Sequence, residues 1–304
     1  MITIAGAGVA GLASAYELAS RGAEVTLYET GADPADNPCS WYAGGMLAPW
    51  CEGESAAPEV VRLGIGAKAW WRQFTKVEDR GTLVLTPPRD RAELTRFARR
   101  TTNHRLIEAA ELAQLEPALA GRFAQALFFE DEAHLDPRQA LIDLSKAVQA
   151  LGVEIRYGTP APAHVDVDCR GMAAPLPGLR PVRGEMALIE APEVEITRTL
   201  RLLHPRIPVY LVPRGKGIYM IGATMIESSS WRQITLRSLL ELLGACFALH
   251  PALGEASVIE TGTGLRPAFA DNMPRLTQLG QTTHVNGLYR HGYLLAPALA
   301  QQLA

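Results

Sequence analysis

The chain of 304 residues has few cysteines, no excess of basic charge and no long apolar run. Its four cysteines, Cys39, Cys51, Cys169 and Cys246, are scattered without a C-x-x-C pair. We therefore expect free thiols rather than a disulfide framework or a zinc site. A net charge of −3 gives no reason to expect nucleic acid as a partner. No apolar run is long enough to cross a membrane, so we expect no membrane association. The scattered cysteines favour a cytoplasmic location, where thiols stay reduced.

The composition itself is typical of a globular protein. Hydrophobic residues make up 48% and charged residues 20% of the sequence, which is enough apolar material to bury a core. The 27 glycines and 21 prolines predict many turns and a structure rich in loops rather than a helical bundle. A chain of this length fits one large domain or two domains of intermediate size.

Residues 1–30 follow the order strand, glycine turn, helix, strand. The turn carries Gly6, Gly8 and Gly11 in the spacing G-x-G-x-x-G, and Glu29 ends the second strand. In such units the first glycine permits a tight turn, the second lets a pyrophosphate approach, and the third lets helix and strand pack closely. The helix N-terminus attracts the phosphate charge, and the acid accepts hydrogen bonds from ribose hydroxyls. The pattern predicts a dinucleotide site, because a ligand-free turn would not need the acid.

Short helices and strands alternate over residues 41–170. We expect helices over 58–76, 89–100, 108–115 and 136–150, and strands over 81–86, 126–129, 153–157 and 165–170. Asp136 followed by Pro137 is typical of a helix start, where the acid caps the helix and proline occupies the first turn. Glu132, His134 and Asp136 alternate as metal ligands can, but no further ligand cluster is near them. We therefore expect no metal site.

Residues 41–50 are small and apolar and contain adjacent glycines. Such a segment beside a dinucleotide site can let backbone amides approach a ligand closely. A simple buried turn is the alternative.

From Val182 onward the pattern changes to strand-like segments separated by glycine and proline. These segments are 182–191, 197–204, 209–215, 217–226 and 256–268, with one helix over 235–249. They predict an antiparallel sheet. Residues 285–300 then repeat the opening order of strand, glycine turn and apolar helix, so we expect them to return to the first domain.

The expected fold is therefore α/β, or more closely α+β with two domains. A Rossmann-like dinucleotide-binding domain is interleaved with an antiparallel-sheet substrate domain. The expected boundaries are 1–80, 130–175 and 260–304 for the first domain, and 81–129 and 176–259 for the second.

Such an architecture could bind NAD or FAD. We find no second glycine fingerprint for a nicotinamide cofactor. The C-terminal glycine turn also offers a helix N-terminus, whose amides can stabilise negative charge on a reduced flavin. Both observations favour FAD, and an NAD-dependent dehydrogenase is the alternative.

Motifs spread along nearly the whole chain resemble those of the FAD-dependent D-amino-acid oxidase and glycine oxidase family. In the family's order they are GAGVAG with Glu29, AGGMLAPWCE (43–52), VRGEM (182–186), YLVPR (210–214), IGATM (221–225), GLRPA (264–268) and GLYRHGYLLAPA (287–298). Within the family the resemblance is greatest to the glycine oxidases of thiamine biosynthesis, the ThiO type.

The resemblance implies an oxidase that deaminates glycine, and other small amino acids, by hydride transfer from Cα to flavin N5. Dioxygen then accepts the electrons, and the products are hydrogen peroxide, ammonia and an imine or glyoxylate. The resemblance further implies a homo-oligomer and delivery of the imine to thiazole synthesis. We expect non-covalent FAD, because no cysteine lies near the last motif, and no side chain acting as acid or base. A D-amino-acid or sarcosine oxidase or dehydrogenase and a non-catalytic FAD-binding protein are the alternatives.

The resemblance assigns substrate roles to five residues. Arg266 matches the arginine that pairs with the substrate carboxylate, where a planar guanidinium can form two parallel hydrogen bonds. Tyr210 matches a tyrosine that borders the substrate, and Arg290 matches an arginine near the flavin and the substrate amine. Met46 and Met225 match pocket-lining positions. Structural arginines, a buried sheet tyrosine and core methionines are the alternatives.

The resemblance also places a larger set of residues at the cofactor. These are Gly6, Gly8, Val9, Ala10, Gly11, Glu29, Ser40, Gly44, Gly45, Met46, Gly171, Arg290, His291, Gly292, Tyr293 and Leu294. His291 should contribute mainly its backbone. Two segments depart from the family pattern: residues 158–168 are short, and Pro208 and Val209 are apolar where some relatives have polar side chains.

Overall fold

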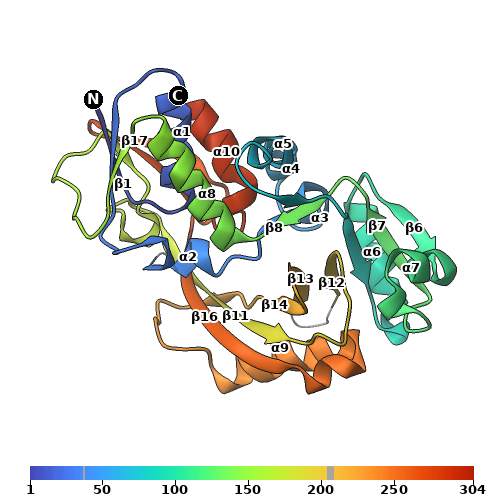
Figure 1. The fold of residues 1–304 in the computed structure, drawn as a ribbon. Helices are drawn as coiled ribbons and strands as arrows, with labels where there is room; N and C mark the ends of the chain where they lie inside the picture. Colours follow the sequence, from blue (N-terminus) through green and yellow to red (C-terminus); the bar gives the residue numbers. More distant parts are fainter. Residues whose placement is uncertain (37, 204–208) are drawn as a thin grey trace.

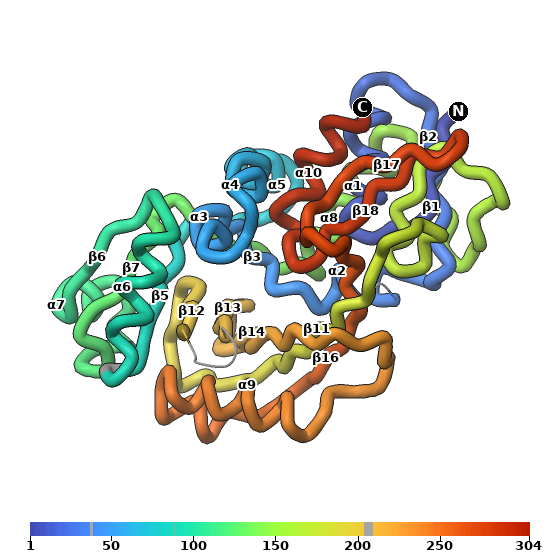
Figure 2. The backbone as a smooth tube through the Cα atoms, turned by 180° about the vertical axis from the view of Figure 1, so that it is seen from behind, coloured from blue at the N-terminus to red at the C-terminus, as the bar shows by residue number. Residues whose placement is uncertain are grey.

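The computed structural model describes residues 1–36, 38–203 and 209–304. In these residues the strands form three sheets. Figures 1 and 2 show both chain ends beside the six-stranded sheet that contains β1 (Ile2–Ala5). Strands β6 (Arg105–Glu108) and β7 (Gln125–Phe129) lie at the opposite end of the molecule. Pro208 and the end of the expected strand at His204 lie outside the described residues.

The opening strand lies inside a six-stranded sheet that is parallel except at one edge. The order across this sheet is β17 (Arg275–Leu279), β18 (Thr282–Asn286), β10 (Val167–Asp168), β1 (Ile2–Ala5), β2 (Val25–Tyr28) and β9 (Glu154–Arg156). Only β17 runs antiparallel to its neighbour. The expected return of the C-terminal segment to the first sheet is therefore confirmed, because β18 pairs with β10.

Helices α1 (Val9–Ser20), α8 (Pro137–Ala150) and α10 (Gly292–Leu303) pack with this sheet (Figure 1). Helix α1 contacts both of the others, and fully buried Leu12 and Leu295 belong to their shared core. The side chain of Asp136 caps α8 by accepting a hydrogen bond from the backbone N–H of Arg138 (2.9 Å). The predicted helix start at Asp136 is thus confirmed.

The large sheet has nine strands. Its order is β15 (Ile226–Glu227), β11 (Arg180–Glu190), β14 (Ile218–Gly222), β13 (Val209–Gly215), β12 (Thr199–Leu202), β5 (Thr82–Leu85), β7 and β6, and β16 (Ser257–Ala268) pairs with β11. All pairs are antiparallel except β5 with β12. The antiparallel sheet predicted for the segments from Val182 onward is confirmed, and the one parallel pair joins it to β5, a strand from a distant part of the chain.

The division into two domains stays a prediction, but one predicted boundary disagrees with the pairing of the strands. Residues 260–268 were assigned to the dinucleotide-binding domain, whereas β16 pairs with β11 in the large sheet along its whole length. The disagreement arises because the antiparallel pairing of β11 with β16 continues to Ala268, so that residues 260–268 belong to the large sheet.

Helix α9 (Leu236–Leu249) covers the large sheet and contacts β11, β13 and β14. The expected helix over 58–76 is instead two short helices, α4 (Pro58–Gly64) and α5 (Ala67–Trp71). Gly64 lets Leu294 of α10 pack against α4, since a Cβ there would lie 2.8 Å from Leu294 Cγ. The prediction of one continuous helix over residues 58–76 was therefore wrong.

The remaining elements are short. They are helices α2 (Pro38–Trp41), α3 (Pro49–Glu52), α6 (Arg91–Arg100) and α7 (Ala109–Leu115), the 3₁₀ turns η1 (Pro34–Asp36), η2 (Pro88–Asp90), η3 (Pro117–Leu119), η4 (Gly171–Ala173) and η5 (Pro251–Glu255), and the third sheet of β3 (Met46–Leu47), β8 (Ala133–Leu135) and β4 (Val77–Glu78). In the described part of the chain, no helix is both long enough and apolar enough to cross a membrane. The four cysteines are free thiols.

Candidate functional site

A cavity of about 540 Å³ is lined by residues from both large sheets. Every expected site residue except Gly11 lines it. These residues are Gly6, Gly8, Val9, Ala10, Glu29, Ser40, Gly44, Gly45, Met46, Gly171, Tyr210, Met225, Arg266, Arg290, His291, Gly292, Tyr293 and Leu294. The fold therefore gathers segments from the first to the last motif around one space, while the binding role of each residue stays a proposal.

The glycine turn at one end of the cavity has no room for side chains. Gly6 has a φ of +95°, and a Cβ there would lie 2.9 Å from the carbonyl oxygen of Cys169. A Cβ on Gly11 would lie 1.8 Å from the oxygen of Gly6, so Gly11 allows close packing and does not face the cavity. The first amides of α1 have no partner within the helix, although Val9 N donates to Ser40 Oγ (3.1 Å). This turn can therefore accept the phosphates of a dinucleotide.

Glu29 is fixed at the end of β2 beside this turn. One carboxylate oxygen accepts a hydrogen bond from Ala7 N (2.7 Å) and the other accepts one from Gly31 N (2.9 Å). The oxygen that accepts from Gly31 N also accepts a hydrogen bond from the Thr30 hydroxyl (3.2 Å), so these contacts fix the orientation of the acid. The position suits a ribose with two hydroxyls.

A second helix N-terminus faces the cavity at α10. His291 is the N-cap residue, and its side chain makes no capping bond. The amides of Gly292, Tyr293 and Leu294 have no partner within the helix, as at any helix N-terminus. Burial lowers the pKa of His291 to about 4, despite the opposing effect of Glu52. A neutral ring at neutral pH agrees with the expectation that His291 contributes mainly backbone.

The turn at Ala43–Gly45 lines the same cavity as these two helix ends and is tightly packed. Gly45 has a φ of +69°, and a Cβ there would lie 2.2 Å from the oxygen of Leu135. Arg214 donates hydrogen bonds to the carbonyls of Ala43 (3.2 Å) and Gly44 (3.0 Å). The turn is thus both buried and part of the cavity wall. We did not predict the role of Arg214, although its place in the YLVPR motif was a signal.

Together these features fit FAD. The cavity joins a phosphate-accepting glycine turn and a ribose-facing acid to a second helix N-terminus, which can stabilise negative charge on the flavin ring. A second dinucleotide-type glycine turn, which a nicotinamide cofactor would need in addition, is absent from the sequence.

Arg266 extends from β16 into the other part of the cavity. Its guanidinium lies over Gly184 of β11, where a Cβ would be 2.3 Å from Arg266 Cζ, and its Nη1 donates to the carbonyl of Thr224 (2.8 Å). Among the described residues, no carboxylate lies within ion-pair distance of this guanidinium. A largely enclosed positive charge without an acidic partner favours binding of an anion.

Arg290 differs because its charge is already compensated. It donates to Glu52 Oε2 (2.6 Å) and to Ser55 Oγ (3.0 Å). Burial acts to raise the pKa of Glu52, but Arg290, His291 and Arg201 together lower it to about 2, so the acid is ionised. This is the salt-bridged arrangement that the sequence left open for Arg290. We did not predict Glu52, the one charged residue of the AGGMLAPWCE motif, although it also lines the cavity.

The other residues at this end form mostly apolar walls. Tyr210 is buried, its pKa is raised by burial, and the guanidinium of Arg201 lies 5.3 Å from its ring centroid. Its hydroxyl is therefore a protonated donor at neutral pH. Met46, Met225 and the unpredicted Trp231 line the same space.

Glu132, His134 and Asp136 have separate structural tasks. Glu132 Oε1 accepts a hydrogen bond from Cys51 N (2.7 Å), His134 is buried in β8, and Asp136 caps α8. Within the described residues, no group of three or more His, Cys, Asp or Glu side chains could hold a metal ion.

Glu132 should make the stability of the protein depend on pH. Burial raises its pKa from 4.5 to about 7, so its contribution to stability is present below about pH 4.5 and is lost as the pH rises through 7. In Glu132→Gln this loss is absent. The free energy of unfolding of the variant, relative to the native protein, should rise by about 3 kcal/mol between pH 4.5 and pH 8. Urea unfolding of the holoprotein at both pH values measures it.

Glu130→Gln, at the exposed neighbouring position, is the matched control for the loss of one carboxylate. The prediction would be contradicted if the difference in free energy of unfolding between Glu132→Gln and the native protein were the same at pH 4.5 and pH 8.

The chain is similar to known proteins along its whole length. The family of FAD-dependent oxidoreductases matches residues 1–304. The Rhizobium etli protein named "Putative thiamine biosynthesis oxidoreductase ThiO" is 53% identical over 311 residues, which cover 100% of this chain and 95% of that protein. The bifunctional protein ThiO/ThiG of a Nostoc species is 27% identical over 342 residues, and the chain spans about half of its length, 52%.

The glycine oxidase of Geobacillus kaustophilus is 25% identical over 349 residues, which cover 97% of this chain and 89% of that protein. Its crystal structure has the same fold, with a TM-score of 0.82 and 22% identity over 99% of this chain and 92% of that one. Both the family match and these relatives agree with the geometry of the cavity. The chain therefore belongs to the FAD-dependent oxidoreductases, as a member similar to ThiO and glycine oxidase proteins.

Proposed function

We propose that this protein oxidises glycine to its imine with non-covalently bound FAD. The observation that carries the proposal is Arg266, an enclosed guanidinium without an acidic partner among the described residues, in the same cavity as the N-terminus of α10. The glycine oxidase among the relatives supports glycine as the substrate. Bound FAD would supply the acceptor for the Cα hydride, with dioxygen as the final electron acceptor and hydrogen peroxide as the product.

The protein's own residues bind and orient the amino acid. Arg266 uses one N–H on the Thr224 carbonyl, and its remaining N–H groups can hold the substrate carboxylate. The protonated Tyr210 hydroxyl can donate a further hydrogen bond to that carboxylate. Met46 and Met225 provide apolar walls that limit water around Cα. Such positioning supplies much of the rate, and no side chain has to act as an acid or base.

The fate of the imine and the assembly of the protein belong to the same proposal. We infer that the imine either hydrolyses to glyoxylate and ammonia or passes to the synthesis of the thiamine thiazole. The Rhizobium etli relative, which is named for thiamine biosynthesis, supports the second route. Non-covalent FAD rests on the last motif, since α10 contains no cysteine, while Cys39 and Cys169 line other parts of the cavity. A homo-oligomer and a cytoplasmic location stay predictions.

Anaerobic addition of glycine to the yellow holoprotein should bleach the flavin absorbance, and in air glycine should release peroxide. We expect kcat/KM for glycine to exceed that for sarcosine or D-alanine by about tenfold, since one methyl group is discriminated to that extent in a close-fitting pocket. Peroxide assays with the three amino acids measure the ratio.

Turnover of glycine no faster than that of sarcosine or D-alanine would refute the substrate assignment and favour a related amine oxidase. A protein that stays yellow with every amino acid would instead be a non-catalytic FAD-binding protein.

A further inference from the structure

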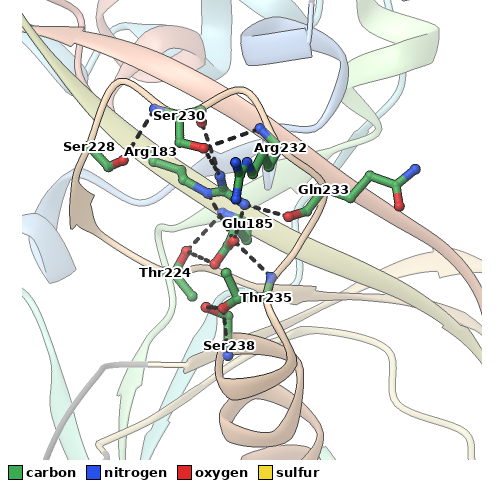
Figure 3. Close-up of polar contacts among 9 residues, drawn as sticks. All are labelled: Arg183, Glu185, Thr224, Ser228, Ser230, Arg232, Gln233, Thr235 and Ser238. Carbon is green, nitrogen blue, oxygen red and sulfur yellow. Dashed lines mark hydrogen bonds and ion pairs between the residues drawn. The ribbon is translucent and has the colours of Figure 1, made fainter.

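A buried ion pair lies directly behind the candidate substrate arginine. Arg183 and Glu185 of β11 are 3% and 0% exposed, and Arg183 Nη2 lies 2.6 Å from Glu185 Oε1 (Figure 3). Because side chains alternate along a strand, these two share one face of β11 while Gly184 between them belongs to the other. Gly184 is the residue on which the Arg266 guanidinium lies. The pair and the arginine thus lie on opposite faces of the same strand.

Arg183 holds the loop that follows β15. Its guanidinium donates hydrogen bonds to the carbonyls of Ser230 (3.0 Å) and Gln233 (2.6 Å), as Figure 3 shows. Glu185 accepts a hydrogen bond from the backbone N–H of Thr235 (3.2 Å), at the start of α9. Since Trp231 of this loop lines the cavity, the ion pair fixes part of the cavity wall.

Glu185 is also bonded to Thr224 through both its backbone and its side chain. Thr224 Oγ1 accepts from Glu185 N (2.9 Å) and donates to Glu185 Oε2 (3.1 Å), and Thr224 N donates to the carbonyl of Glu185 (3.2 Å). Thr224 is 3% exposed. Three hydrogen bonds therefore leave its carbonyl little freedom to move.

The Thr224 carbonyl is the acceptor for Arg266 Nη1, at 2.8 Å. Among the described residues this is the one hydrogen bond within the protein that orients the guanidinium. A continuous series of contacts thus leads from Arg183 through Glu185 and Thr224 to Arg266. A long arginine side chain has many rotamers, so a fixed acceptor of this kind decides where its remaining N–H groups point.

We propose that Glu185, paired with Arg183, is a positioning residue for carboxylate binding. It holds the Thr224 carbonyl so that the Arg266 guanidinium presents its free N–H groups to the substrate. The inference rests on the proposed function, in which Arg266 binds the carboxylate of an amino acid.

The chain contains a matched ion pair that tests whether Glu185 serves stability alone. Glu116 is also 0% exposed, and it accepts hydrogen bonds from Thr197 N (3.1 Å), Thr197 Oγ1 (2.7 Å) and Arg198 Nε (2.8 Å). It has the same kinds of partners as Glu185 but does not line the cavity. Glu116→Gln therefore reproduces the loss of a buried carboxylate at a distance from Arg266.

The experiment measures three quantities on FAD-loaded protein: the Kd of glycolate from the change in flavin absorbance, kcat and KM with glycine, and the midpoint of thermal unfolding. Thr224→Val removes the hydroxyl at nearly constant volume. We expect Thr224→Val and Glu185→Gln to raise the Kd of glycolate and the KM of glycine about tenfold, as loss of one oriented charged hydrogen bond does. The value of kcat should change much less. Thr224→Ser keeps the hydroxyl and should bind as the native protein does.

Glu116→Gln should lower the unfolding midpoint and leave glycolate binding unchanged. If Thr224→Val and Glu185→Gln lower the midpoint as Glu116→Gln does, but bind glycolate normally, the pair is structural and the inference is overturned. If Glu185→Gln does not fold, Thr224→Val with Thr224→Ser decides the question alone. Normal glycolate binding by Arg266→Met would overturn the proposed function and this inference with it.

Discussion

Arg266→Met should lower kcat/KM for glycine about a thousandfold, because the substrate carboxylate loses two charge-assisted hydrogen bonds of about 2 kcal/mol each. The effect should lie mainly in KM and in the Kd of glycolate. Methionine fills most of the same space without charge, so the protein should fold and remain yellow. Steady-state kinetics and the flavin spectrum of the purified variant measure both effects.

Arg198→Met is the control for loss of a buried arginine. Arg198 pairs with Glu116 away from the cavity, at 2.8 Å, so the variant should lose stability and keep the KM of the native protein. Arg266→Lys should recover only part of the affinity, because an ammonium cannot form the paired contacts of a guanidinium. Native KM in Arg266→Met would remove the basis of the proposed carboxylate site.

Gly184→Ala should reduce affinity for glycine about a hundredfold without unfolding the protein. The new methyl group would lie 2.3 Å from Arg266 Cζ, in the space that the guanidinium occupies. Arg266 must then move away and lose its bond to Thr224, which costs roughly 3 kcal/mol of binding. The backbone of β11 accepts alanine, so the unfolding midpoint should change little. Glycolate titration and thermal unfolding test the two halves of the prediction.

Gly244→Ala is the matched control. Gly244 lies in α9, where a Cβ would meet no atom within 4 Å, and alanine favours a helix over glycine. This variant should bind glycolate normally and be slightly more stable. Normal binding by Gly184→Ala would show that Arg266 can bind a carboxylate from another position.

The local elements were largely predictable because their causes are local. The glycine turn after β1 follows from three glycines spaced to meet a strand and a helix, and Asp136–Pro137 caps α8 through neighbouring backbone amides. Apolar periodicity likewise located α9 near 235–249. The helix expected over 58–76 was wrong: it is two helices, and Gly64 at the end of the first accommodates Leu294 of α10, a contact between distant segments that periodicity does not reveal.

The pairing of charges was less predictable, because it depends on which strands are neighbours. The motifs placed Arg266 at the substrate carboxylate and Arg290 near the flavin and the substrate amine, but they did not indicate which guanidinium has an acidic partner. The fold pairs Arg290 with Glu52 and leaves Arg266 without an acid among the described residues. Arg214, Glu52 and the Glu185–Thr224 contact could not be assigned roles from spacing, because each joins residues that lie tens to hundreds of positions apart.

The sequence by itself predicted a dinucleotide site near Gly6–Glu29, and its motifs placed the chain among the FAD-dependent oxidoreductases, the family that also matches the whole chain. These features reside in short segments whose backbone conformation and residue type suffice to specify them. Only the tertiary structure decided that Arg290 pairs with Glu52, that Arg266 has no acidic partner among the described residues, and what holds Arg266 in place. That outcome depends on the register of β11 with β16, which puts Gly184 beneath Arg266, and on the burial of Arg183 and Glu185 behind it. Burial and pairing set the effect of a charge, and both arise only when the strands come together.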